Sequence, residues 1–149
     1  MNNLTNSRSL YRTFSSCESL ISVKLVGMNA VPSDGEYYQC FYNATSLQYI
    51  EGIDFSYAND SGDYSSIFNF VRNLNYIKFP GGATDETGFK YSVALRYCPL
   101  NRDAILEIFN HLVTITHSAT LDLRDNSFTA DLTAADKLIA TNKWWSLNL

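Results

Sequence analysis

The sequence predicts an α/β fold in which a short solenoid of stacked repeats builds a mostly parallel sheet with irregular or short-helical outer turns. Apolar residues recur at a spacing of 27 residues over about residues 11–79. The divergent remainder, about residues 88–149, alternates strand and helix patterns and is expected to form a strand-helix-strand-helix-strand cap. With 149 residues, 46% of them hydrophobic, the chain is expected to fold as a single domain spanning 1–149.

The repeat is visible as columns of residues with the same chemical character. Three windows share the pattern Phe-x-x-small-x-Ser/Asn-Leu-x-x-Val/Ile. Its apolar columns are Phe14, Phe41 and Phe68; Cys17, Ala44 and Val71; Leu20, Leu47 and Leu74; and Val23, Ile50 and Ile77. Because one window cannot bury its own apolar side chains, stacked windows would turn each column into a continuous ladder. We therefore expect Cys17 to fill a small buried position. The spacing of 27 lies within the range of leucine-rich repeats.

Each window contains a short segment in which apolar and polar residues alternate. These segments, at residues 21–25, 48–50 and 75–79, are expected to be strands with Val23, Ile50 and Ile77 facing the core. The segments 32–35 and 59–63 carry Pro, Gly, Asn and Asp and are expected to be turns. The Phe-containing stretch is expected to form a helical turn on the outer side.

The segment after Phe79 continues with a strand at residues 90–96 and a first helix. Asn101 is a suitable N-cap for a helix that runs to about residue 115. Its apolar residues recur at helical spacing, so one stripe is expected to be buried. His111 is expected on the surface of this helix.

A second helix follows a strand at residues 121–123. Thr133 and Asp136 have the spacing of a capping box, and the helix is expected to reach about residue 142 with Leu138 buried. Residues 144–149 are expected to form the last strand. This alternation of strand and helix is typical of parallel crossovers and could extend the sheet of the repeats.

The repeat pattern and the C-terminal segment resemble the BspA-like leucine-rich repeat proteins of bacteria and of phages that infect gut bacteria. The runs that carry the resemblance are residues 101–112, 121–123 and 131–145. Trp144 departs from the pattern, which favours a small residue such as glycine there. The resemblance implies a non-catalytic surface or virion-associated interaction protein and transfers no catalytic residues.

Composition excludes several other classes of protein. A formal charge of −4 and a pI near 5.0 argue against nucleic-acid binding. No apolar run approaches eighteen residues, so no membrane insertion is expected. The first twenty residues lack an apolar run, so no signal peptide is expected in this chain. The resemblance suggests the cell surface or a virion, and the compartment stays unknown.

The outward residues of the predicted sheet are the candidate binding residues. Counting from the inward positions places Ser22, Tyr49 and Tyr76 in one outward row. The neighbouring row holds Lys24, Glu51 and Lys78, with Asp122 as a continuation and Arg96 and Arg124 pointing the same way at the strand ends. Exposed tyrosines beside alternating charges suit a protein or glycan partner. The alternative is that these residues only stabilise a solvated sheet through cross-strand pairs.

The sequence offers no constellation for catalysis, a metal or a cofactor. Cys40 and Cys98 do not have CxxC spacing, so a zinc site is not expected. His111 and His117 are six residues apart, which separates them on a helix. We expect no enzyme activity, because nothing combines a nucleophile, a base and an orienting group.

The N-terminal end of the predicted stack is the second functional feature. Only about ten polar residues precede the first Phe, so the strand near residues 22–26 is expected to be an open edge. The leading hypothesis is an interaction module that binds a protein or glycan through its sheet face or self-associates through this edge. The alternative is a structural component of a phage particle, either a decoration or a fibre-associated protein.

Overall fold

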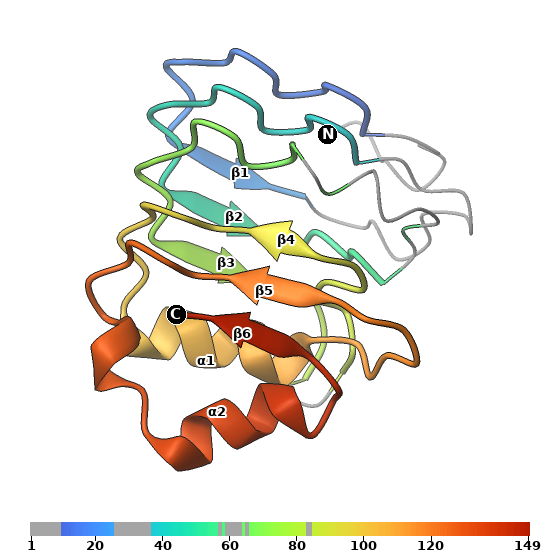
Figure 1. Cartoon of the computed structure of the whole chain (residues 1–149). Coiled ribbons are helices and arrows are strands. Elements are labelled where there is room, and N and C mark those ends of the chain that lie inside the picture. Colours follow the sequence, from blue (N-terminus) through green and yellow to red (C-terminus); the bar gives the residue numbers. More distant parts are fainter. Residues whose placement is uncertain (1–9, 26–36, 57, 59–63, 65, 83–84) are drawn as a thin grey trace.

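A computed structural model describes residues 10–25, 37–56, 58, 64, 66–82 and 85–149. Within them the chain is mixed α/β, with two parallel three-stranded sheets and two α-helices (Figure 1). The predicted turns at 32–35 and 59–63 lie outside the described residues.

The first sheet contains β1 (Ser22–Lys24), β2 (Tyr49–Glu51) and β3 (Tyr76–Lys78) in that order. All pairings are parallel, and Val23, Ile50 and Ile77 occupy one register position. These three side chains are buried, as their alternation with polar neighbours predicts. Strands separated by one repeat spacing in the sequence therefore lie side by side.

The opposite side of the first half is built from irregular turns. Residues 11–16 and 38–43 are turns rather than helices. Phe41 stacks on Phe14 with ring centroids 5.3 Å apart, and on Phe68 at 5.7 Å, so the Phe column forms one apolar row. A left-handed backbone conformation recurs at matching positions of successive turns. These positions are Ser16, Asn43, Phe70, Tyr97 and Asp125.

The second half contains β4 (Val93–Ala94), α1 (Arg102–His111), β5 (Thr120–Asp122), the 3-10 helix η2 (Thr129–Asp131), α2 (Ala134–Thr141) and β6 (Ser146–Asn148). The strands form a second parallel sheet in the order β4-β5-β6. The predicted order of strand, helix, strand, helix and strand is confirmed.

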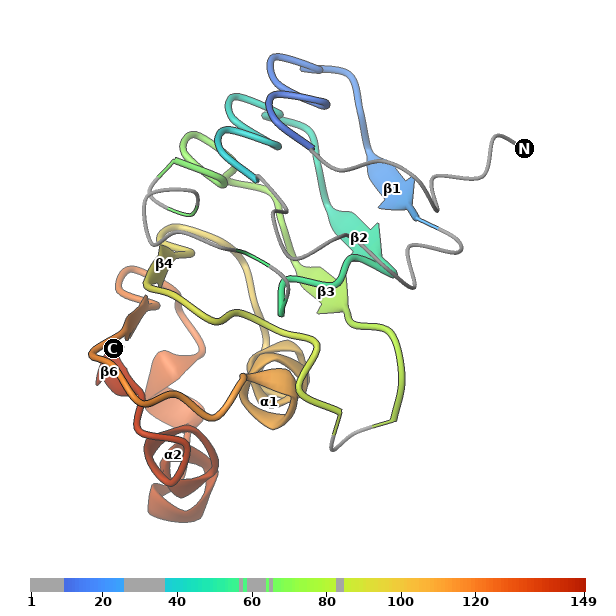
Figure 2. The same cartoon turned by 90° about the vertical axis from the view of Figure 1, so that its right-hand side faces the viewer.

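The second half does not extend the first sheet, contrary to the prediction. Asp103 lies one repeat spacing after Tyr76, so the position of the next strand falls inside α1, which packs against β3. The new strands form on the other side of the molecule, where the Phe turns lie (Figure 2). The Sγ of Cys98, just after β4, donates to the carbonyl of Val71 at 3.4 Å. The first helix thus lies next to the first sheet, and β4–β6 lie on the side of the turns.

Both helices begin at the predicted caps. The Asn101 side chain accepts from the amide of Ala104 at 2.9 Å. The Thr133 hydroxyl accepts from the amide of Asp136 at 3.2 Å, while Asp136 accepts from the Thr133 amide at 2.9 Å. Asp136 also pairs with Arg102 at 2.7 and 3.0 Å, which connects the two helices. The predicted end of the first helix is wrong, because Leu112 already has an extended ψ of 136°.

Three predictions about burial are wrong, because the sequence patterns do not show which neighbouring element covers a side chain. Cys17 is exposed, since among the described residues its turn is bonded to the Phe41 turn on one side and to no turn on the other. Leu138 is 54% exposed on the outer side of α2. His111 is buried at the end of α1, where its ring stacks on Phe79 at 5.2 Å.

Candidate functional site

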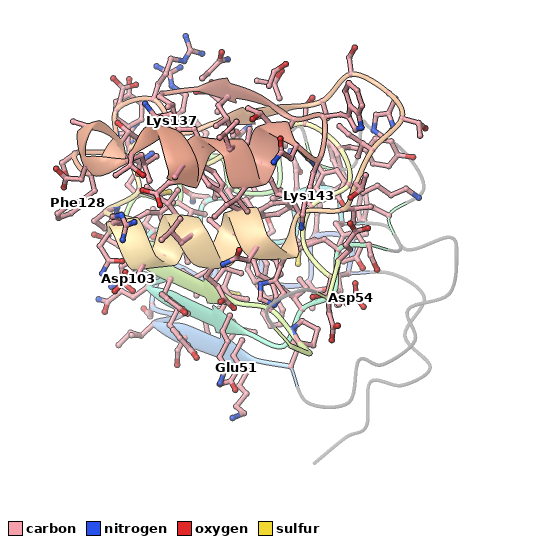
Figure 3. The ribbon with its side chains drawn as sticks, turned by 90° about the horizontal axis from the view of Figure 1, so that it is seen from below. Glu51, Asp54, Asp103, Phe128, Lys137 and Lys143 are labelled. Atoms are coloured by element: carbon pink, nitrogen blue, oxygen red, sulfur yellow. The ribbon has the colours of Figure 1, made fainter. Side chains whose placement is uncertain are left out.

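The outer face of the first sheet brings together five of the predicted binding residues. We call Lys24, Tyr49, Glu51, Tyr76 and Lys78 the first-sheet face. The Tyr49 and Tyr76 rings stack at 5.9 Å with an interplanar angle of 12°. Glu51 lies between Lys24 at 3.1 Å and Lys78 at 3.5 Å, so three strands contribute to one charged row. Figure 3 shows Glu51 on the outer side of the sheet.

The charges of this face are coupled to its tyrosines. The hydrogen bond and ion pair with Lys24 lower the pKa of Glu51, so the carboxylate stays ionised beside the two lysines. Burial raises the pKa of Tyr49, and Glu51, which accepts its hydroxyl hydrogen bond at 3.3 Å, raises it further. Burial also raises the pKa of Tyr76, so both tyrosines are neutral near pH 7. Two lysines and one glutamate leave the charged row with a net charge of +1.

Arg96, Asp122 and Arg124 do not join this face, contrary to the prediction. They belong to the second sheet and its following turns, which lie on the other side of the molecule from β1–β3 (Figure 2). The Arg124 guanidinium donates to both oxygens of Asp122 at 2.9 and 2.7 Å, and Arg96 pairs with Asp125 at 2.7 Å. The bond from Arg124 lowers the pKa of Asp122. These partners satisfy one another's charge on a separate surface.

Sequence reasoning missed an aromatic cluster beside these ion pairs. The Tyr97 ring lies under two guanidinium groups, Arg96 at 5.1 Å and Arg72 at 5.5 Å. Tyr97 and Phe70 are 50% and 53% exposed and line one shallow hollow. The two aromatic residues are separated by one repeat spacing, so the periodicity could have identified them as a second outward row.

The thiols of Cys40 and Cys98 are buried. Burial raises the pKa of Cys98 to about 12 and raises the pKa of Cys40 as well. Thiols held in the neutral form are poor nucleophiles and poor metal ligands. Across the described ranges, no group of three or more His, Cys, Asp or Glu residues is arranged to hold a metal ion. The Nε2 of His117 lies 3.0 Å from the carbonyl oxygen of Lys90.

In the part of the chain that the structure describes, neither helix has the length and apolar character needed to cross a bilayer. Comparison with family models, curated proteins and solved structures finds no match to this chain.

Proposed function

We propose that this protein is a non-catalytic interaction module that binds a protein or glycan partner through the first-sheet face. In this proposal the chain is a short solenoid of the leucine-rich repeat type, similar to BspA-like proteins. The parallel register of β1–β3, in which each strand follows the previous one by one repeat spacing, supports it. The left-handed turns at Ser16, Asn43 and Phe70, which recur at the same spacing, support it further.

The observation that carries the binding proposal is the pair of stacked tyrosines beside an alternating charge row. Tyr49 and Tyr76 present partly exposed rings and neutral hydroxyl groups. Amphipathic aromatic rings bury a large apolar area with few rotatable bonds, which makes them effective anchors at interfaces. The strand backbone holds the rings in place, so binding orders few additional bonds.

The edge of β1 is the second surface in the proposal. Among residues 10–25, 37–56 and the later described segments, β1 pairs only with β2. Ile21, next to this strand, is 60% exposed, and Phe14 is only partly buried, whereas Phe41 is fully buried. A strand that is paired on one side within the described residues, next to partly exposed apolar side chains, favours association with a second copy of the chain.

Binding of the full chain to a glycan array and to a displayed peptide library tests the sheet face. We expect the wild type to bind one class of ligand. The affinity of Y49A/Y76A for that ligand should be roughly thirtyfold lower. The L138A variant, altered at an exposed position of α2, is the matched control and should keep wild-type affinity for that ligand. Equal binding by Y49A/Y76A and the wild type would contradict the proposal.

Sedimentation at increasing protein concentration tests the edge. We expect the wild type to associate and I21E to remain monomeric, because a charge at this position opposes burial against a second copy. The control is L138E, which places the same charge at an exposed position of α2. This variant should associate like the wild type. A wild type that is strictly monomeric at high concentration removes self-association from the proposal.

A further inference from the structure

The link between α2 and β6 carries an aromatic side chain that the fold does not bury. Trp144 is 73% exposed, the largest exposed fraction among the large apolar side chains in the described segments. Its neighbour Trp145 is 2% exposed and donates its indole N–H to the carbonyl of Val113 at 2.9 Å. Trp145 therefore anchors this link, and the ring of Trp144 is free to serve another purpose.

The backbone at Trp144 suits glycine better than tryptophan. The amide of Trp144 donates to the carbonyl of Thr141 at 3.0 Å, and the amide of Trp145 donates to that of Ala140 at 3.3 Å. This bonding ends a helix with one left-handed residue, and Trp144 has a φ of +71°. Glycine is favoured at such a position because a Cβ is strained there. A bulky, exposed ring at a strained position is a reason to look for a binding role.

Trp144 lines a hollow together with five residues from two neighbouring segments. Its lining residues are Ile115, Thr116, His117, Ser118, Trp144 and Ser146. Ile115 is buried and provides an apolar floor, whereas the hydroxyl-bearing residues and His117 are exposed at the rim. No Asp, Glu, Lys or Arg side chain is part of this lining. The hollow thus combines a flat aromatic wall with several groups that can form hydrogen bonds.

The walls of the hollow are held by bonds to neighbouring elements. The Lys143 ammonium donates to the carbonyls of Asn110 and Leu112 at 2.6 and 2.7 Å, where α1 ends (Figure 3). The amide of Ile115 donates to the carbonyl of Lys143 at 3.2 Å. The two chain segments that line the hollow, residues 115–118 and 144–146, are therefore held in place through Lys143 and Ile115. The hollow is formed before a ligand binds.

We propose that this hollow, the Trp144 site, binds a neutral hexopyranose unit of a glycan, with the sugar ring stacked on the indole. A pyranose has one face of C–H groups that packs on an aromatic ring and a perimeter of hydroxyl groups that bond to uncharged donors and acceptors. The lining offers no Asp, Glu, Lys or Arg side chain to pair with a charged ligand. The site is separate from the first-sheet face, so either proposal can fail alone.

Titration of the full chain with neutral oligosaccharides tests the Trp144 site. The probes are hexamers of glucose, mannose and N-acetylglucosamine and a tetramer of galactose, followed by calorimetry and tryptophan fluorescence. We expect at least one probe to bind, and W144G to reduce its affinity by roughly thirtyfold. Because glycine suits the backbone at this position, W144G should fold, and its circular dichroism spectrum should match that of the wild type. F128A, which removes another exposed aromatic ring, next to η2, is the matched control and should bind the probe like the wild type.

Chemical protection adds an independent readout. N-bromosuccinimide should oxidise the exposed Trp144 before Trp145, and a saturating concentration of the bound sugar should slow this oxidation. The proposal is overturned if no neutral probe binds, if W144G binds as tightly as the wild type, or if a galacturonic acid hexamer binds more tightly than every neutral probe.

Discussion

The stacked phenylalanines allow a quantitative test of how the first half of the chain is held together. Phe41 is fully buried and lies between Phe14, at 5.3 Å, and Phe68, at 5.7 Å. Replacing a buried phenylalanine by alanine costs about 3–5 kcal/mol. Each aromatic pair that is lost accounts for about 0.5–1.5 kcal/mol. We expect F41A to lower the free energy of unfolding by about 4 kcal/mol. The loss is a large fraction of the stability of a domain of this size, which is about 5–15 kcal/mol.

Phe14 provides the matched comparison within the same row. Its ring is only partly buried and stacks on Phe41 alone in the described part of the chain. Because Phe14 is partly exposed and has one stacking partner instead of two, we expect a smaller loss, about 3 kcal/mol, in F14A. Urea unfolding followed by the fluorescence of the buried Trp145 measures both values, with F41L as a milder variant should F41A fail to fold.

The result that refutes this reasoning is an equal loss in the two variants, because equal losses would mean that Phe14 is as fully enclosed as Phe41. A loss below about 1 kcal/mol in F41A would show that the Phe row is not a main element of the core.

Three further predictions concern individual side chains. Arg102 lowers the pKa of Asp136 below its ordinary 3.8, so the stabilisation by this carboxylate should be present at neutral pH and lost as the pH falls below about 4. Unfolding curves of D136N and the wild type should therefore converge in acid, and a constant difference down to pH 2 would contradict the assignment. An aromatic disulfide reagent should modify Cys17 rapidly and Cys40 only after unfolding, because Cys40 is buried; rapid modification of both would show that the core opens. At Trp144, glycine should be more stable than alanine by about 1 kcal/mol in thermal unfolding, since φ is +71° and both variants lack the ring; greater stability of W144A would remove the argument from strain.

Local signals in the sequence predict the order of the strands and helices and the N-caps of both helices, but not where the first helix ends. The repeat spacing predicts the pairing of β1, β2 and β3, because residues that fill one apolar ladder must lie side by side. Asn101 and Thr133 were identified as caps because their side chains bond to amides only a few residues away. The five residues of the first-sheet face follow from the same register and from the alternation of side chains along a strand.

The assignment of neighbours between elements required the tertiary structure. A helical pattern predicts an apolar stripe but does not identify the element that covers it, so the sequence could not show that α1 would pack on β3 and displace a fourth strand. The separation of Arg96 and Arg124 from the first-sheet face follows from that displacement. His111 is buried against Phe79 and Leu138 lies on the exposed side of α2, and neither outcome follows from the helical pattern alone. The sequence by itself determined the strands, the caps and the outward rows through contacts within one repeat spacing, whereas the packing of helices against sheets decided which of those rows share a surface.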